Sequence, residues 1–428
     1  AVRAVSSFNF RSLRQAVVDL SATFRERYPR GKEFASKLDE LEASSARVLA
    51  MGGDRGSAFA SQFRALAAEL NRLRAEALLA NPLLDFDRLV VVKRATDAGT
   101  QRLGRPSDFY GHFPFFTAYG RELALPQNHF SLAGVRQTGW DNEIAILTPV
   151  RPDGRLATLY RPAGSEYVGE VELHWDAGRL LFSMARAGRY GVYEIHTNGT
   201  GLRQVTPDDQ PDVDNFDATY LPNGKVLFCG TASYQSVPCW NGLHAVPNLY
   251  SINPDASGMR QLTFDQDEAG SPTMLNTGQV LYSRWQYTNT THVYGHILFQ
   301  MNPDGTGQRE FYGSNSYWPN GLYFARPVPE HPSRVATILS GYHGDHRMGE
   351  LLVLDTAKGR YGETGVVQRI PGYGRAVEPR IEDRLTSGSW PKFLHPYPLS
   401  DKYFLVSAKV APEANWSVYL VDVFDNML

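Results

Sequence analysis

The sequence predicts a mainly β protein, a six- or seven-bladed β-propeller preceded by a small α-helical N-terminal segment. One change of pattern and one repeat support this prediction. Apolar residues near the N-terminus follow helical spacing, and the rest of the chain carries short strand-like runs. Within that second part, a strand–turn–strand phrase recurs at intervals of roughly fifty residues.

The helical segment is expected to span residues 1–82. Apolar residues at spacings of three and four begin at Leu13, Val17, Leu20 and Phe24. Breaks rich in Gly and Pro at 29–31 and 52–56, followed by Pro82, predict three helices joined by short turns. The pattern continues at Leu38, Leu41, Val48, Leu49, Phe63, Leu66, Leu70 and Leu73.

The propeller is expected to span residues 83–428. Short apolar or alternating runs, bounded by Gly, Pro, Asn and Asp, are typical of strands. No helical stretch of a dozen residues separates them, which argues against a parallel sheet built from βαβ units. The runs lie at 89–92, 143–147, 179–183, 225–228, 279–282, 334–339, 351–354 and 403–406.

The repeated phrase predicts the blades. It occurs at 193–206, 249–263 and 298–309, each time as a strand, an Asn/Asp turn and a returning strand. A second hairpin lies between the copies, at 221–228 and 275–282, so each period supplies a four-stranded blade. The last repeat, 403–424, looks unfinished, and we therefore expect this chain to be part of a longer polypeptide.

Composition and charge exclude several classes of partner. The chain has 428 residues, 42% of them hydrophobic, and 43 Lys and Arg against 45 Asp and Glu. Because the charges balance, the chain has no excess of positive charge with which to bind nucleic acid, and a nucleic-acid partner is not expected. No apolar run reaches the length of about 18 residues that a transmembrane helix needs.

The only two cysteines are Cys229 and Cys239. Neither belongs to a CxxC or CxxCH pattern, so no haem is expected to be covalently attached to this chain. The spacing leaves two alternatives open: two buried thiols, or one disulfide across a hairpin.

Several phrases resemble known families. Asn-Pro-Asp-Gly-Thr-Gly with Arg-Gln-Leu-Thr resembles the TolB-like propeller repeat. A resemblance over almost the whole chain is to the hydrazine synthase alpha-subunit family, of which this chain would be a divergent member. It is carried by the stretches 80–86, 141–145, 209–215, 313–320, 347–351 and 390–398.

The hydrazine synthase resemblance implies an exported protein, periplasmic or otherwise extracytoplasmic, whose signal peptide has been removed. In that family a helical-plus-propeller part precedes a region with c-type haems. Haem c would thus come from another region or subunit, with a C-terminal haem domain or a multi-haem cytochrome as the partner. The chain departs from the family at Ser233 and Ser271, where relatives often have cysteine, which weakens the case for inherited thiolate–metal chemistry.

The most specific chemical hypothesis that the residues support is a site for a divalent metal. Thiolate and imidazole ligands suit zinc or another transition metal. Loop connections of a propeller often meet at one mouth of its central channel, which would bring such ligands together. The candidates are Cys239, His292, His343 and His346, with His296 nearby; the alternative is ordinary solvated or hydrogen-bonded histidines.

Three weaker patterns remain. Tyr317 and Trp318, within an aromatic group that includes Tyr312, Tyr323 and Phe324, could cover a haem edge or stack on a sugar, or simply pack between blades. An acidic run could bind calcium, although its spacing is not that of an EF-hand; it comprises Asp208, Asp209, Asp212, Asp214 and Asp217. A hydrolase lacks a GxSxG element and would need a carboxylate pair at the channel mouth.

These observations lead to two functional hypotheses. In the first, the chain is a scaffold and one wall of a redox site in a larger complex, with haem supplied by its partner. If that complex is an enzyme, the resemblance implies an oxidoreductase acting on nitrogen compounds. In the second, the chain is a non-catalytic TolB-like propeller that binds a protein or glycan.

Overall fold

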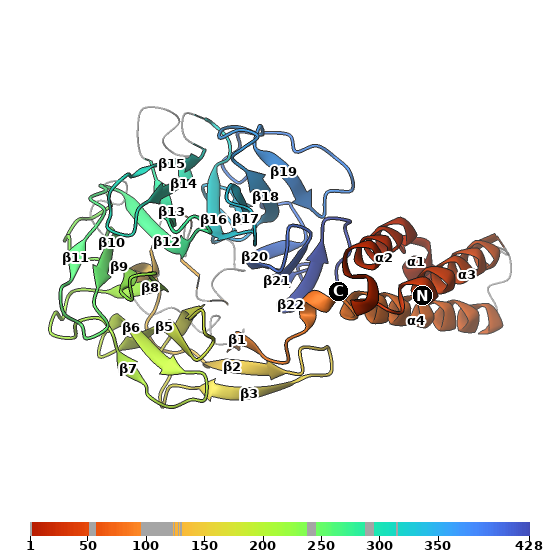
Figure 1. The fold of residues 1–428 in the computed structure, drawn as a ribbon, viewed down its shortest axis with the longest axis horizontal. Coiled ribbons are helices and arrows are strands. Elements are labelled where there is room, and N and C mark those ends of the chain that lie inside the picture. Colours follow the sequence, from red (N-terminus) through yellow and green to blue (C-terminus); the bar gives the residue numbers. More distant parts are fainter. Residues whose placement is uncertain are drawn as a thin grey trace.

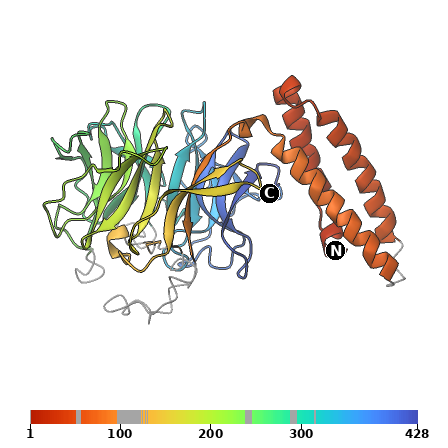
Figure 2. The ribbon, with the colours of Figure 1, turned by 90° about the horizontal axis from the view of Figure 1, so that it is seen from below.

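The computed structural model describes residues 2–50, 57–95, 131–237, 245–286, 295–313 and 316–428, together with 123, 125, 126 and 128. A ring of β-sheets forms a disc, and the N-terminal helices lie beside its edge (Figures 1 and 2). The predicted class, a mainly β propeller with a small helical segment, is confirmed.

The helical segment contains the three predicted helices and one short additional helix. Asn9 accepts a hydrogen bond from the Ser12 backbone N–H and so caps the first long helix. The expected inward face is confirmed at most positions, but Leu49 is 42% exposed because it lies at the solvent side of the last turn. The helices are α1 (Val2–Ser6), α2 (Phe10–Phe24), α3 (Gly31–Ala50) and α4 (Ser57–Leu79).

The described strands form consecutive antiparallel sheets. The first three sheets contain β1 (Leu89–Arg94), β2 (Asn142–Thr148) and β3 (Arg155–Tyr160); β4 (Val168–Leu173), β5 (Arg179–Arg186), β6 (Arg189–His196) and β7 (Arg203–Gln204); and β8 (Asn215–Tyr220), β9 (Val226–Gly230), β10 (Asn248–Ile252) and β11 (Arg260–Gln261). The next three contain β12 (Glu268–Met274), β13 (Val280–Trp285), β14 (His296–Met301) and β15 (Arg309–Tyr312); β16 (Gly321–Pro327), β17 (Arg334–Ser340), β18 (Glu350–Asp355) and β19 (Val366–Ile370); and β20 (Lys392–Pro398), β21 (Tyr403–Lys409) and β22 (Ser417–Asp422).

A single parallel bridge, His296 to Gly321, joins the fourth of these sheets to the fifth. The described strands therefore group into six radial sheets (Figure 1). Whether the complete ring has six or seven blades stays a prediction, because parts of the chain lie outside the described residues.

The repeated turns adopt the backbone that their sequence demands. Gly199, Ala256 and Gly305 occupy equivalent positions, with φ of 85°, 64° and 86°. In each turn the preceding Asn or Asp side chain accepts a hydrogen bond from a backbone N–H two residues on, at 3.0 Å. The repeat seen in the sequence is therefore a repeat in structure.

The helical segment shares a hydrophobic core with the last sheet. Tyr403, Leu405 and Leu420 pack in one cluster with the buried faces of the helices. Asp19 of α2 accepts hydrogen bonds from Lys402 Nζ and, at 2.9 Å, from the Tyr403 hydroxyl. These contacts attach the helices to the side of the disc where the first and last sheets meet (Figure 1).

Candidate functional site

The innermost strand of five sheets carries the same irregularity. β4, β8, β12, β16 and β20 each shift register against the next strand by one extra residue, which is a β-bulge. In Figure 1, β8, β12, β16 and β20 face the middle of the ring. A repeated bulge therefore surrounds the axis of the propeller.

At each bulge one non-glycine residue has a positive φ, between 44° and 53°. Such residues are uncommon, and they cluster at functional sites because the surrounding structure must stabilise them. All five lie on innermost strands and are not fully buried, so they face the axis of the ring, which we call the channel. We name them the channel ring: Glu170, Asp217, Ser271, Phe324 and His395.

The ring contains two carboxyl groups on neighbouring sheets. Glu170 Oε1 accepts a 2.6 Å hydrogen bond from the Tyr167 hydroxyl, whereas Oε2 is buried without a hydrogen-bond partner among the described residues. Burial and then the charge of Asp217 raise the pKa of Glu170 to about 7. Burial also raises the pKa of Asp217, to about 6, against the opposing effects of Arg347 and Arg326.

The imidazole of the ring is held neutral. Its ring lies 4.1 Å from that of Phe324, measured between centroids. The surrounding protein, and then the cations Arg326 and Arg94, lower the pKa of His395 to about 4. At neutral pH the channel ring therefore presents carboxyl, hydroxyl, neutral imidazole and aromatic groups.

Below the ring, two residues further along each inner strand, an ion pair spans the channel. Arg326 Nη2 and Nη1 lie 2.6 and 3.0 Å from the two Glu172 oxygens. Arg326 also donates to Thr273 Oγ1 at 3.1 Å, and Thr219 contacts Glu172 at 3.5 Å. This layer connects β4, β8, β12 and β16 by their side chains.

Above the ring lies a second ion pair. Arg347 Nη2 is 2.7 Å from Glu268 Oε1, and both residues are under 10% exposed. The Arg347 guanidinium also lies 5.2 Å from the centroid of the Tyr323 ring. Ion pairs thus border the channel ring on both sides.

A distant segment reaches this upper layer. Asn128 is buried; its side chain accepts a hydrogen bond from the Arg347 backbone N–H, and its carbonyl accepts one from the Tyr323 hydroxyl at 2.8 Å. His346 Nδ1 lies 3.0 Å from the Leu125 carbonyl oxygen. The connection between β1 and β2 therefore packs against the connection between β17 and β18.

The predicted metal ligands are only partly described. Cys239 and His292 lie outside the described residues. His343 Nδ1 is 2.6 Å from Asp383 Oδ1, and His346 is buried against Leu125. No group of three or more His, Cys, Asp or Glu side chains that could hold a metal occurs in the described part of the chain. The metal site stays a prediction.

The other predicted groups are spread apart. Tyr317 is 54% exposed, whereas Trp318 is 2% exposed and packs in a hydrophobic cluster. In the acidic run, Asp214 accepts a hydrogen bond from the Tyr190 backbone N–H, while Asp217 belongs to the channel ring. Cys229 is a free, fully buried thiol whose pKa is raised well above its ordinary value by burial.

The sequence reasoning missed the channel ring as a unit. Asp217 was noticed only as part of an acidic run, and Glu170 and His395 were not considered. A signal existed, because Glu170, Asp217 and Ser271 each stand third or fourth in an inner strand. An alignment of the blade sequences with one another would have put these three residues at the same position. Their residue types alone do not predict a β-bulge.

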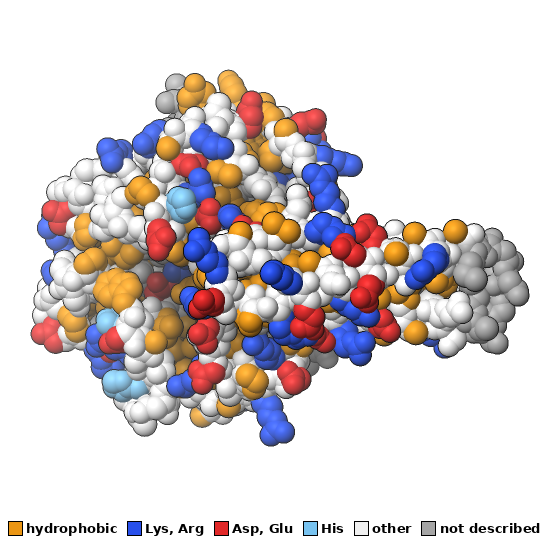
Figure 3. Space-filling view, turned by 45° about the vertical axis from the view of Figure 1, so that its right-hand side comes forward, with side chains coloured by type: hydrophobic (Ala, Val, Ile, Leu, Met, Phe, Trp, Pro, Cys, Tyr) orange, Lys and Arg blue, Asp and Glu red, His pale blue; other side chains and the backbone are white. Residues whose placement is uncertain are grey.

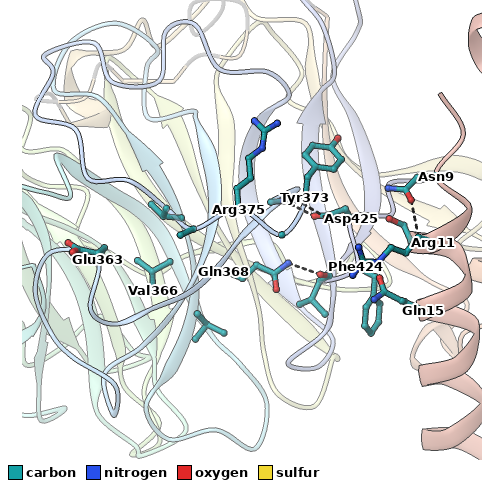
Figure 4. Close-up of a pocket in the computed structure, with 17 residues that line it drawn as sticks. Asn9, Arg11, Gln15, Glu363, Val366, Gln368, Tyr373, Arg375, Phe424 and Asp425 are labelled. Atoms are coloured by element: carbon teal, nitrogen blue, oxygen red, sulfur yellow. Dashed lines mark hydrogen bonds between the residues drawn. The ribbon is translucent and has the colours of Figure 1, made fainter. Parts of the chain in front are cut away.

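A groove of about 690 Å³ lies where the helices meet the propeller (Figure 4). Its walls are built by internal contacts: Asp425 accepts from the backbone N–H groups of Gly372 and Tyr373, and Gln368 donates to the Val423 carbonyl. Over the face shown in Figure 3, acidic and basic side chains are interspersed. The groove lacks a convergent set of titratable groups, so the channel is the better candidate site.

The fold and the channel define a β-propeller with an attached helical bundle. The structure is similar to that of Kuenenia stuttgartiensis hydrazine synthase, with a TM-score of 0.52 and 15% identity over 78% of this chain. This chain spans 43% of the hydrazine synthase chain that it matches. At that identity the similarity shows the propeller fold alone.

Two other solved structures align less closely. They are a putative TolB from Agrobacterium tumefaciens, with a TM-score of 0.40 and 12% identity over 66% of this chain and 84% of that chain, and a nidogen/laminin complex, with a TM-score of 0.42 and 12% identity over 68% and 89%. No protein-family model and no curated protein sequence matches the chain. No described helix is long and apolar enough to cross a membrane.

Proposed function

We propose that this chain is the exported propeller module of a hydrazine-synthase-like protein, a divergent member of that family. It acts as a scaffold and as one wall of a redox site in a larger complex. Haem c is supplied by a C-terminal haem domain or a cytochrome subunit. The chain contributes binding and positioning groups, and the redox chemistry belongs to the partner's haem.

The observation that carries this proposal is a shared face of the disc. From the second sheet onward, the second strand is joined to the third at the same face at which one sheet is joined to the next; in the first sheet the connection from β1 to β2 lies at this face. His343 and His346 lie in such a connection, between β17 and β18. The connections between β9 and β10 and between β13 and β14, in which Cys239 and His292 stand in the sequence, begin and end at this face. We call it the loop face.

The loop face also carries large apolar side chains that are open to solvent. Phe264 is 76% exposed, Tyr234 65% and Tyr317 54%. Large exposed apolar side chains are candidate contacts for a protein partner. This supports docking of a haem-carrying protein region on the loop face.

The test is co-purification with the haem-carrying partner from the source organism, comparing F264S and Y317S with the unmodified protein. We expect each variant to lose at least about tenfold in affinity, because hot-spot aromatic residues commonly contribute that much. W175S is the matched control, since Trp175 is 60% exposed in the connection between β4 and β5, at the opposite face. Equal retention of all three variants would refute docking on the loop face.

The metal prediction belongs to the same proposal. A divalent ion held by Cys239, His292, His343 and His346 would anchor the loops of this face. Elemental analysis of protein purified without a His tag should then find about one metal per chain, lost in H343A/H346A. A chain without stoichiometric metal would remove this part of the proposal and leave the docking surface standing.

The second candidate function is a non-catalytic binding propeller. The exposed aromatic side chains of the loop face favour this function as well, because such side chains can bind a protein or a glycan that carries no haem. The two candidates differ in the bound partner: haem absorbance accompanies the complex in the first and is missing from it in the second.

A further inference from the structure

We propose that Glu170 and Asp217 form a proton-exchanging site in the central channel. One carboxyl of the pair takes up a proton from water or a small protic molecule in the channel and later returns it. This inference goes beyond the proposed function and does not rest on it, because it concerns side chains within this chain alone.

Geometry brings the two carboxyls together. Glu170 and Asp217 occupy equivalent bulges of β4 and β8, with φ of 44° and 49°. These two inner strands contact each other directly. The Asp217 backbone N–H donates to Ser183 Oγ at 2.9 Å, which fixes the bulge against the neighbouring sheet. The backbone, rather than a flexible loop, therefore sets the position of both groups.

The pair differs from the other carboxylates of the channel. Glu172 and Glu268 each form an ion pair with an arginine, at 2.6 and 2.7 Å. Neither Glu170 nor Asp217 forms an ion pair within the described residues; the groups beside them are hydroxyls, those of Tyr167 and Ser183 for Glu170 and that of Ser271 for Asp217. A buried carboxyl oxygen in this situation is stabilised by acquiring a proton.

The surrounding charges limit the pair to about one proton near neutral pH. Repulsion between the carboxylates disfavours double ionisation, while nearby guanidinium groups disfavour double protonation. The raised pKa values, about 7 for Glu170 and about 6 for Asp217, agree with this balance. The titratable and charged groups that act on the pair are Arg94, Tyr167, Glu172, Tyr190, Cys229, Arg326 and Arg347.

The exchange step is a simple proton transfer. The O–H or N–H bond of the donor breaks, its electron pair stays on the donor atom, and an O–H bond forms on a carboxyl oxygen of the pair. The reverse step restores the carboxylate. No oxidant or reductant is consumed, and partial exposure of both side chains to the channel gives the donor access.

The experiment is an infrared titration of the protonated-carboxyl band in the whole chain, from about pH 5 to about pH 9, around the shifted carboxyl values. Burial also raises the pKa of Asp422 to about 7, so all samples carry D422N to remove that signal. In this background we expect one carboxyl to titrate near pH 7. E170Q should abolish that titration and leave the Asp217 carboxyl, whose pKa of about 6 lies about one pH unit lower.

D217N provides the decisive second variant. Removing the like charge should lower the titration midpoint of Glu170 by about one pH unit, while burial keeps it above the ordinary value. If D217N fails to fold by circular dichroism, D217S removes the same charge. A titration near pH 7 that survives E170Q, or a midpoint that is unchanged without the Asp217 charge, would overturn the proposal.

Discussion

At the scale of single residues, the channel shows how the same side-chain type behaves differently according to its partner. Glu268 is buried beside the Arg347 guanidinium, while Glu170 is buried beside another carboxyl. The first forms an ion pair with its partner, and the second is pushed towards the protonated form. Both outcomes follow from local charge and burial rather than from the intrinsic acidity of glutamate.

The ion pair above the ring should be costly to break from one side. R347M leaves Glu268 buried and unpaired, so we expect the free energy of unfolding to fall by about 3–5 kcal/mol. Adding E268Q should restore much of the loss, because the uncompensated charge is gone. Urea unfolding of the single and double variants measures both effects; a loss below about 1 kcal/mol for R347M would contradict this role.

The raised carboxyl pKa values predict how stability depends on pH. Glu170 and Asp422 have folded-state pKa values of about 7, and Asp217 of about 6, all above the unfolded values near 4. Between these limits each of these three carboxyls binds more protons in the folded state, so each contributes stability that is lost as pH rises from about 4 to about 7. The lowered pKa of His395, about 4, acts in the opposite sense over this interval, so the test compares two variants. The melting temperature of the unmodified protein, relative to that of D422N, should decline as pH rises. A difference that does not change with pH would contradict the prediction.

At the scale of elements, the inner-strand bulges make the strongest demand on the backbone. Ser271 has a φ of 50°, a conformation that glycine adopts easily and β-branched residues resist. S271V should therefore destabilise the fold by about 1–3 kcal/mol, whereas S271G should be neutral or slightly stabilising. Thermal unfolding of both variants is the measurement, and equal effects of Val and Gly would argue against a strained bulge.

The strands and helices were predictable from sequence because each depends on local periodicity. The runs at 179–183 and 403–406 lie in β5 and β21, and the breaks at 29–31 and 52–56 separate the three long helices. Leu49 was assigned to the buried face wrongly, since periodicity does not tell where a helix extends past its partner. The bulges were not predictable, because their residues are not glycines.

At the scale of the whole molecule, the helices and the last sheet should unfold together. They share one hydrophobic cluster, and Asp19 joins α2 to Lys402 and Tyr403. D19A leaves the Tyr403 hydroxyl without this acceptor, and we expect a loss of about 1–3 kcal/mol. A matched control is D39A, since Asp39 pairs with Arg14 within the exposed helical segment. A loss no larger than that of the control would show that the Asp19 contacts do not couple the two parts.

Long-range convergence was the part of the site that sequence reasoning could not supply. The meeting of Asn128 with Arg347 joins residues 219 positions apart, and no local pattern encodes it. The same holds for the ion pair of Glu172 with Arg326, 154 positions apart. The expectation that propeller connections share one face did follow from the repeat, because alternate strand connections must emerge on the same side.

The most direct test of the central proposal is the ultraviolet–visible spectrum of the native complex, purified from its source together with elemental analysis. If the loop face is one wall of a haem-containing redox site, the complex should show a Soret band and stoichiometric iron. If the haem is carried by a separate cytochrome subunit, F264S should lose both on purification. A complex that absorbs only in the aromatic region and contains no iron would contradict the redox proposal and leave the binding propeller as the function.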